Sequence, residues 1–501
     1  MIIFISFWQV ITKLFLTFVN LKNTQKMNNL FGRKKEMKML DNYMKSGKSE
    51  FIAIYGRRRI GKTFLIKEYF KDKFAFSMSG IINGKMSEQM FHFVQALENA
   101  GCEKHNNPRN WNTAFAVLQK HLEAKYGRRK RCVIFIDELP CLDTPRSGFI
   151  RALDHFWNSW ASSHKNVKLI ICGSATSWII KNIIDSHGGL HNRITHEIHL
   201  HQFSLYEVEQ YIKSKKFGYD RISIAQLYMA IGGVPYYLSL LEQGKSLPQN
   251  IDSLFFADDA KLRDEFSRLY SSLFKSPDIY IQVIRILANN KTGLTRNEIC
   301  DKLNLKSGSK ISEVLSDLTN CDFLRKFNTK EKRIRKNMAI YQLVDFFTLF
   351  HFSFVESKTT DTNFWTHNIG KPIINTWLGL AFERLCMAHI PLIKKALGID
   401  SIYTEYYAWR SRESTPGSQI DLAIERADRM IDICEIKYSN APYLMTNEEE
   451  MKLRIRANDF VNETKNNLGI EFVLITTYGL RPGKHSSLIN KQVTLNDIYK
   501  E

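Results

Sequence analysis

Residues 56–63, with the sequence G-R-R-R-I-G-K-T, restrict the fold of this chain more than any other segment. They follow an apolar run at 51–55 with the pattern of a buried strand, and they precede a helical pattern that reaches Phe70. A glycine-bearing turn in that context points backbone N–H groups at a phosphate, and the positive end of the next helix adds to the attraction. Further strand-like runs alternate with helical ones up to about residue 200, so we expect a phosphate-binding loop in a parallel α/β sheet.

The loop predicts a site for ATP and Mg²⁺. Lys62 is expected to bridge the β- and γ-phosphates as a catalytic residue, and the Thr63 hydroxyl is expected to hold the metal. The predicted ATP-binding residues of the loop are Gly56, Arg57, Arg58, Arg59, Ile60, Gly61, Lys62 and Thr63.

A second motif, V-I-F-I-D-E at 133–138, fits the same site. Its four apolar residues predict a buried strand that ends in Asp137 and Glu138. Asp137 can hold Mg²⁺, mostly through water, and Glu138 can orient or deprotonate the attacking water as the second catalytic residue. A strand that ends in two ordinary solvated acids is the alternative. The acid pair downstream of a phosphate loop is more specific than either motif alone.

Two more residues are candidates for the ATP site. Ser174 follows the apolar run at 169–172, and the tip of such a strand often touches the γ-phosphate or the attacking water. A plain strand-to-helix turn explains Ser174 equally well. Arg193 follows a glycine-containing loop and is either a phosphate-sensing arginine or a solvated surface residue.

Size and charge set broader limits. A chain of 501 residues corresponds to about three domains of about 150 residues each. Lys and Arg number 71 against 51 Asp and Glu, and the net charge of +20 is compatible with nucleic acid, nucleotides or acidic membrane without choosing among them. The eight cysteines are scattered with no C-x-x-C pair, which argues against a zinc site or disulfide framework and favours reduced thiols in a cytoplasmic protein.

Residues 1–20 are strongly apolar and allow three interpretations. A membrane anchor is long enough, but Lys13 would lie inside the span. A signal peptide lacks its basic first region and its cleavage site. We favour Met27 as the natural start, with 1–26 as an apolar leader or extension. No stable membrane association is then expected unless residues 1–20 are translated and retained.

The phosphate loop, the Asp137–Glu138 pair, the entry F-G-R-K-K-E at 31–36 and the segment G-G-V-P at 232–235 together resemble the archaeal-type ATPases of the AAA/STAND superfamily. The resemblance covers about residues 30–240. It implies a P-loop ATPase domain at 27–200 and a helical lid at 201–272, in which the G-G-V-P turn packs near the nucleotide. It leaves open whether the chain forms a homo-oligomer.

Residues 273–350 resemble a winged helix. Three short amphipathic helices are predicted at 277–290, 295–304 and 309–320, and a β-like stretch with a basic turn follows. The resemblance implies a recognition helix at 309–320 and a basic wing at 325–336 that suits DNA phosphates. Glu313 and Asp317 on the expected reading helix, and the frequent use of such domains in protein binding, leave DNA contact open.

Residues 370–501 resemble the PD-(D/E)xK nuclease fold. A β-hairpin is predicted from 419–424 and 430–437, with Glu435 and Lys437 on one face and Asp421 able to close that face from the other strand. Asp421 and Glu435 are the predicted metal ligands, Lys437 the group that stabilises the water or phosphate, and Glu383 the additional acid. The family's Pro-Asp pair is missing, since Ile420 precedes Asp421, and this puts cleavage in doubt more than the fold.

The expected fold is therefore α/β: a P-loop NTPase parallel sheet with a helical lid, a winged-helix domain and a C-terminal α/β nuclease-like domain. Two functions are open. One is an ATP-hydrolysing switch that acts on DNA. The other is an ATP-controlled regulatory or scaffold protein whose C-terminal domains bind protein and do not cleave DNA.

Overall fold

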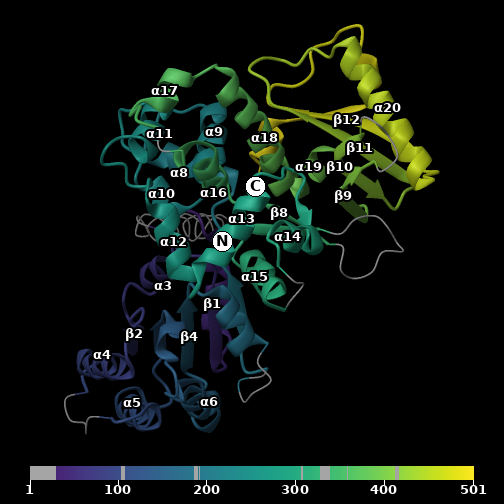
Figure 1. Cartoon of the computed structure of the whole chain (residues 1–501). Helices are drawn as coiled ribbons and strands as arrows, with labels where there is room; N and C mark the ends of the chain where they lie inside the picture. The colour runs from purple at the N-terminus through teal and green to yellow at the C-terminus, as the bar shows by residue number, and fades with distance from the viewer. Residues whose placement is uncertain are drawn as a thin grey trace, which may run out of the picture. The chain divides into compact units, whose positions relative to one another are not determined.

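The computed structural model describes residues 30–102, 108–185, 190, 192–305, 309–327, 339–357, 359–411 and 417–500 (Figure 1). These residues form two compact units. The first comprises residues 30–57 and 61–200, and the second comprises residues 58–60 and 201–500. Residues 1–26, the predicted leader, lie outside the described part of the chain. Within that part, no helix is both long enough and apolar enough to cross a bilayer.

The first unit is a five-stranded parallel sheet with helices on both faces. Its helices and strands are α2 Lys34–Lys45, β1 Glu50–Tyr55, α3 Lys62–Phe70, β2 Phe76–Ser79, α4 Met86–Asn99, α5 Trp111–Tyr126, β3 Cys132–Asp137, η1 Leu139–Leu142, α6 Phe149–Ser159, η2 Ala161–Ser163, β4 Val167–Gly173, α7 Thr176–Ile179, η3 Ile180–Ile184 and β5 His196–His199. The strand order is β2-β3-β4-β1-β5, and each neighbouring pair is parallel. This arrangement confirms the predicted P-loop NTPase type of sheet.

The sequence explains why this sheet is covered on both sides. β1, β3 and β4 are buried at every position, as expected for parallel strands with helices on both faces. Alternate residues of these strands pack into one aromatic-rich core with α4, α5 and α6, which lie together on one side of the sheet in Figure 1. All carboxyl ends of the strands lie at one edge of the sheet, and the polar residues that follow β1, β3 and β4 are therefore brought to that edge.

The second unit combines helices with two sheets. Its elements are α8 Leu205–Ser214, α9 Arg221–Ile231, α10 Pro235–Leu238, α11 Leu247–Phe255, α12 Glu265–Leu273, α13 Pro277–Ala288, β6 Leu294–Thr295, α14 Arg296–Lys302, α15 Ser309–Asn320, β7 Leu324–Phe327, β8 Ile340–Leu343, α16 Phe346–Phe350, η4 His351–Val355, α17 Phe364–Asn368, α18 Pro372–Ala388, α19 Ile390–Ala396, β9 Thr404–Arg410, β10 Gln419–Arg426, β11 Met430–Lys437, α20 Asn447–Thr464, β12 Gly469–Thr476, η5 Ser486–Leu488, β13 Lys491–Thr494 and α21 Leu495–Ile498.

The smaller sheet is antiparallel and has the order β6-β8-β7. In the sequence β6 lies between α13 and α14, and β7 and β8 follow α15. The larger sheet is mixed and has the order β13-β12-β11-β10-β9. In it, β9, β10 and β11 are antiparallel, whereas β12 and β13 run parallel to β11. Both the predicted hairpin and the predicted strand at 472–476 are present in this sheet.

An aromatic cluster joins the helices of the second unit. Rings of α11, α16, η4, α17 and α18 pack against one another, with centroid separations such as 4.5 Å for Phe255 and Phe350 and 5.7 Å for Trp365 and Trp377. Beside this cluster, the Asp252 carboxylate of α11 is only 4% exposed. It accepts hydrogen bonds from the backbone N–H groups of Trp365 and Thr366, at 2.8 and 3.1 Å, at the start of α17. The helices from 205 onward and those after 364 therefore share one core.

Candidate nucleotide site and a second charged centre

The phosphate loop lies between β1 and α3, and its backbone needs glycine. Gly56 has a φ of 144° and Gly61 a φ of 86°, both in the range that favours glycine. Gly61 caps α3, whose first residue is Lys62. Lys62 is only 5% exposed, and its ammonium donates to the carbonyl oxygens of Gly56 and Arg57 at 2.7 and 2.8 Å. The loop thus closes around its own lysine at the amino end of a helix, the geometry suited to a bound phosphate.

Asp137 and Thr63 meet although they are 74 residues apart in the sequence. The Thr63 hydroxyl donates to Asp137 Oδ2 at 2.7 Å, and the backbone N–H of Glu138 donates to Asp137 Oδ1 at 2.9 Å. Burial raises the pKa of Asp137 above its usual value, and the hydrogen bond from Thr63 opposes that rise. The carboxylate therefore lies beside the first turn of α3, where the hydrogen bond from Thr63 offsets part of the cost of its burial.

Glu138 is held by Ser174. The backbone N–H of Ser174 donates to Glu138 Oε2 at 3.1 Å, and its hydroxyl donates to the other carboxylate oxygen. Glu138 has a φ of 44°, which turns its side chain away from the path of β3. Gly173 allows the backbone of β4 to pass close to Pro140, because a Cβ on residue 173 would lie only 2.7 Å from the Pro140 side chain. The structure therefore brings four predicted residues together in the first unit: Thr63, Asp137, Glu138 and Ser174.

Arg193 stands apart from these contacts. Its side chain is exposed in the segment before β5, and residues 186–189 and 191 of the same loop lie outside the described residues. Its role as a phosphate sensor stays a prediction.

Arg59 belongs, with Arg58 and Ile60, to the second compact unit, and its side chain binds residues of that unit. Its guanidinium donates to both carboxylate oxygens of Glu265, with Nε–Oε1 at 3.0 Å and Nη2–Oε2 at 3.3 Å. The guanidinium also lies 4.1 Å from the centre of the Tyr236 ring. Glu265 is 3% exposed, and it accepts a further hydrogen bond from the Tyr237 hydroxyl at 3.4 Å. The Arg59 side chain is thus occupied by a buried carboxylate.

The G-G-V-P segment is a close backbone crossing. The Phe203 N–H donates to the Gly233 carbonyl at 2.7 Å, and a Cβ on Gly233 would lie 1.9 Å from the Phe203 carbonyl oxygen. Only glycine fits at this position. Pro235 then begins α10 at a position where its missing N–H costs nothing.

A second charged centre lies on the larger sheet of the second unit. β10 and β11 pair Leu422 with Cys434, and the same register places Asp421 opposite Glu435. Directly opposed residues of an antiparallel pair point to the same face. Lys437 Nζ lies 2.8 Å from Glu435 Oε1, and Arg456 Nη1 of α20 lies 2.7 Å from Glu435 Oε2. Two predicted acids and the predicted lysine therefore share one face.

Glu383 of α18 belongs to the same centre electrostatically. Burial, followed by the charge of Asp421, raises the pKa of Glu383 to about 7. Burial also raises the pKa of Asp421, and the hydrogen bond from Gln419 at 2.5 Å opposes that rise. Burial works against the charge of Lys437, but Glu435 keeps the pKa of Lys437 above its usual value. A cation near the carboxylates would stabilise their ionised forms.

Sequence reasoning missed Arg456 and Gln419. Arg456 lies 21 residues after Glu435 in an 18-residue helix, and helical periodicity does not tell which residue of α20 faces the hairpin. Gln419 had a local signal, because it stands two residues before Asp421 on the same strand.

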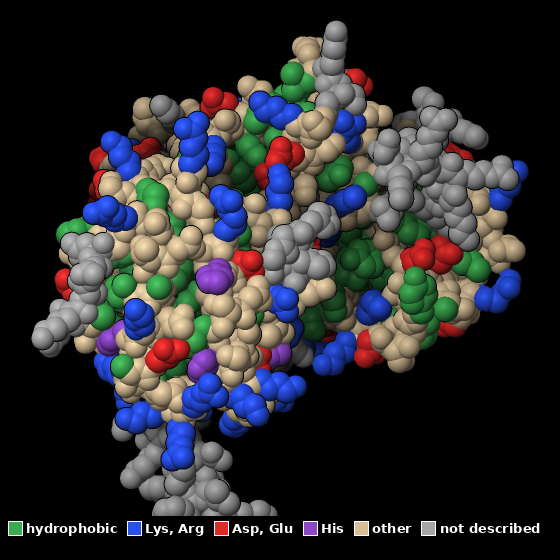
Figure 2. Space-filling view, turned by 90° about the horizontal axis from the view of Figure 1, so that it is seen from below, with side chains coloured by type: hydrophobic (Ala, Val, Ile, Leu, Met, Phe, Trp, Pro, Cys, Tyr) green, Lys and Arg blue, Asp and Glu red, His purple; other side chains and the backbone are tan. Residues whose placement is uncertain are grey.

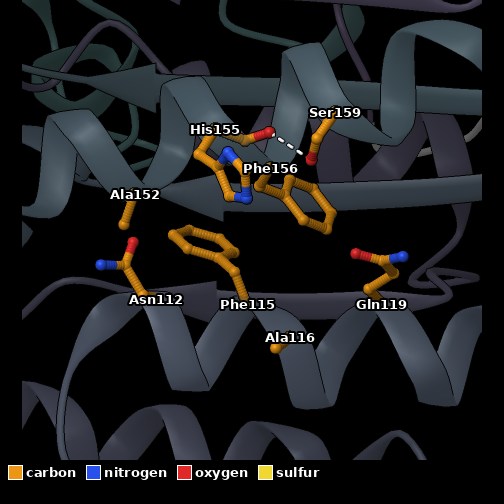
Figure 3. Close-up of a pocket in the computed structure, with 8 residues that line it drawn as sticks. All are labelled: Asn112, Phe115, Ala116, Gln119, Ala152, His155, Phe156 and Ser159. Atoms are coloured by element: carbon orange, nitrogen blue, oxygen red, sulfur yellow. Dashed lines mark hydrogen bonds between the residues drawn. The ribbon is translucent and has the colours of Figure 1, made fainter.

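Outside both centres, a hollow of about 380 Å³ lies between α5 and α6 in the first unit (Figure 3). The rings of Phe115 and Phe156, which stack with centroids 5.0 Å apart, line one side of it. The Ser159 hydroxyl donates to the His155 carbonyl at 2.6 Å on its rim. None of the predicted site residues lines it, so we assign it no role in the nucleotide site.

Comparison with known proteins agrees with the nucleotide site. Residues 30–241 match the family described as an ATPase domain predominantly from Archaea. An uncharacterized protein of Methanocaldococcus jannaschii, MJECL04, is 24% identical over 421 residues, which cover 81% of this chain and 87% of that protein. An uncharacterized ATP-binding protein of the same organism, MJ0423, is 44% identical over 41 residues, which cover 8% of this chain and 70% of that protein.

Solved structures of similar fold include the Walker-type ATPase PABY2304 of Pyrococcus abyssi. It has a TM-score of 0.47 and 16% identity, with 65% of this chain and 96% of that chain covered. The ORC2 protein of Aeropyrum pernix has a TM-score of 0.41 and 12% identity, with 66% of this chain and 94% of that chain covered. The family match spans the phosphate loop and the Asp137–Glu138 pair, and it supports an archaeal-type ATPase domain over residues 30–241.

Proposed function

We propose that the chain is an ATP-hydrolysing switch of the AAA/STAND type. The observation that carries this proposal is the 2.7 Å hydrogen bond from the Thr63 hydroxyl to Asp137. Because the hydroxyl donates its proton to the carboxylate, its oxygen lone pairs stay available to a cation, and these donors fit Mg²⁺. The bound metal would neutralise charge on the phosphates. Lys62 would hold the β- and γ-phosphates, and Asp137 would hold the metal mostly through water.

Glu138 is the residue proposed to orient the attacking water and accept its proton. Its hydrogen bonds from Ser174 fix the direction of the carboxylate. Ser174 is therefore proposed as a positioning residue. A solvated acid with no partner would lack this orientation.

The experiment measures ATP turnover by the wild type and by Lys62→Ala, each with and without DNA. We expect the variant to lose turnover, because the buried ammonium has no substitute in the loop. Lys67→Ala is the matched control, since Lys67 lies on the same helix and is exposed. Turnover in Lys62→Ala equal to that of the wild type would remove the proposal.

For the second unit we propose a nuclease-like centre that acts on DNA. Support comes from the acid-bearing helix α18, the hairpin of β10 and β11 and the later strand β12, the features on which the resemblance to the PD-(D/E)xK fold rests. Further support comes from Asp421 and Glu435 on facing positions with Lys437 at 2.8 Å from Glu435. Asp421 and Glu435 would hold a divalent metal, which would activate water, and Lys437 would stabilise charge on the phosphate.

Cleavage is tested with supercoiled plasmid and Mg²⁺ or Mn²⁺. The wild type should nick the plasmid and Glu435→Ala should not. Glu448→Ala is the control, because Glu448 is an exposed acid of α20. Nicking by Glu435→Ala at the wild-type rate would mean that this centre does not cut.

The alternative function, an ATP-controlled scaffold that binds protein, is favoured by one feature of the segment proposed as a winged helix. The exposed face of α15 carries Lys310 and Glu313 among serines, so it is nearly neutral. The Asp317 carboxylate on the same helix is used internally, because it accepts from the Tyr280 hydroxyl at 2.7 Å. Most of the predicted wing, residues 328–336, lies outside the described residues. Arg325 at its start packs inward, with its guanidinium donating to the Met387 carbonyl at 2.9 Å.

The two functions differ in how DNA affinity depends on salt. On the face drawn in Figure 2, Lys and Arg side chains are spread over the surface and outnumber the acidic ones. Binding through phosphates predicts a steep fall of affinity as salt rises. An absence of any DNA shift at low salt, together with an absence of nicking, would leave the scaffold function.

A further inference from the structure

Two arginines lie beside the charged centre of the larger sheet without an acid to pair with. Arg325 comes from β7 and Arg384 from α18. Arg325 donates to the Met387 carbonyl at 2.9 Å and to Gln342 Oε1 at 2.5 Å. Arg384 donates to the Lys291 carbonyl. All these acceptors are neutral, and neither guanidinium forms an ion pair with a described carboxylate.

Each guanidinium also keeps one buried donor that no acceptor meets. The Nε atoms of Arg325 and Arg384 are inaccessible to solvent and have no hydrogen-bond partner among the described residues. Leaving a buried donor on a charged group unpaired is costly, and native proteins rarely do so without a functional reason. Two such donors at neighbouring positions show that the described residues do not fully satisfy this pair; because each Nε is closed to solvent, a ligand would bind through the Nη groups.

The two groups are close, because the Lys291 carbonyl that accepts from Arg384 also accepts from Gln342 Nε2 at 2.8 Å, and Gln342 Oε1 accepts from Arg325. Burial, and then the charge of Arg384, lowers the pKa of Arg325 to about 10. Burial lowers the pKa of Arg384 to about 10 as well, against the charges of Glu383 and Asp421. Arg384 therefore adjoins the acids of the proposed nuclease-like centre and Arg325 adjoins Arg384, so an anion between the arginines would relieve their repulsion.

A phosphate group fits this arrangement better than another side chain would. It offers several acceptor oxygens in different directions, and a guanidinium can give it two parallel N–H donors. A structural pair that only joined β7 to α18 would find its acceptors within the protein. Here the hydrogen bonds to Met387, Gln342 and Lys291 fix the two arginine side chains. Each guanidinium has further N–H groups that these bonds do not use.

We propose that Arg325 and Arg384 form a phosphate-binding subsite that holds a polynucleotide strand next to Glu383 and Asp421. The inference rests on the proposed function of that centre and adds a residue from the small antiparallel sheet to it. Arg325 is then a strand-binding residue of the C-terminal centre and not part of an exposed wing.

The test uses the full-length protein with saturating ADP and Mg²⁺, so that the phosphate loop is filled. Binding of a fluorescent 20-nucleotide DNA strand is measured by anisotropy over a salt series for the wild type, Arg325→Gln and Arg384→Gln. Each variant should bind about tenfold or more weakly, because a charge-assisted contact is lost. The slope of log affinity against log salt should fall by about one for each variant. Arg429→Gln is the control, since Arg429 is an exposed cation on the turn at the far end of the same hairpin.

A second arm separates the sources of the phosphate. Inorganic phosphate should raise the melting temperature of the wild type in the presence of ADP, and the rise should shrink in both variants. Weaker binding of DNA in the variants assigns the subsite to a polynucleotide. A loss confined to inorganic phosphate overturns the polynucleotide proposal in favour of a small anion. Unchanged binding of both overturns the subsite altogether.

Two controls keep the result decisive. If a glutamine variant unfolds, Arg325→Lys and Arg384→Lys keep the charge and remove the paired donors, so a loss of DNA affinity is expected with the salt slope unchanged. Plasmid nicking is measured in parallel. Weaker DNA binding in the variants without nicking by the wild type supports the subsite and removes the nuclease. Wild-type nicking with unchanged DNA affinity in both variants keeps the nuclease and overturns the subsite.

Discussion

The Arg59–Glu265 pair predicts an unequal response to the loss of either partner. Removing one member of a buried ion pair costs about 3–5 kcal/mol, because the other charge stays buried and unpaired. Glu265 is 3% exposed and Arg59 is 30% exposed. Arg59→Ala leaves the buried carboxylate with only the Tyr237 hydroxyl, so we expect a local loss of about 2–3 kcal/mol, below that range because Arg59 is partly solvated. Glu265→Gln leaves an arginine that reaches water, and we expect about 1 kcal/mol.

The double variant shows whether the pair itself carries the effect. Arg59→Ala with Glu265→Gln has no buried charge left, so its loss should be about 1–2 kcal/mol smaller than the sum of the single losses. Hydrogen exchange of the amides of α10 and α12 measures this local stability in the full-length chain. Equal losses in the two single variants, or strictly additive losses in the double one, would refute the reasoning. So would a tenfold loss of ATP affinity in Arg59→Ala with unchanged exchange, since the side chain would then act as a phosphate ligand.

Three more predictions concern the two charged centres. Glu138→Gln should keep ATP binding, measured with a fluorescent nucleotide, and lower single-turnover hydrolysis about 100-fold or more because the proton acceptor is lost; Glu123→Gln, an exposed acid of α5, is its control. Ser174→Ala should lower hydrolysis by a smaller factor and leave ATP affinity unchanged, and an equal loss of affinity would mean that Ser174 binds the nucleotide. Glu383 has a pKa of about 7 in the folded chain against an ordinary 4.5. Its contribution to stability is therefore present at low pH and lost as the pH rises through 7, so the melting temperature of the wild type should fall relative to that of Glu383→Gln between pH 5 and pH 8.

The geometry of the candidate nucleotide site was predictable because its determinants are local. The order of strand, glycine turn, Lys62 and helix specifies both the backbone conformation and the chemistry, and the strand ending in Asp137 has one natural place in a parallel sheet. The hairpin was predictable for the same reason, since a tight turn sets Asp421 against Glu435. The side chain of Arg59 was not, because Glu265 is 206 residues away in the sequence.

Arg325 illustrates a different limit of sequence reasoning. A basic residue at the start of a charged stretch normally faces solvent. Nothing in the local sequence indicates that Arg325 donates hydrogen bonds to Gln342 and to the Met387 carbonyl. Its partners are 17 and 62 residues away, and they come from a neighbouring strand and a later helix. Contacts of this kind depend on how segments pack, which periodicity along one segment does not report.

The carboxylate of Asp252 has a consequence for how this chain can be shortened. A truncation after residue 350 would follow the predicted boundary of the middle domain, but it would remove both N–H donors that this carboxylate accepts from at the start of α17. The shortened protein would expose the rings of Phe255 and Phe350 and would keep an anion with nothing to satisfy it. Aggregation of such a fragment would therefore result from the loss of α17 from the helical core. It would not show whether the remaining residues bind DNA.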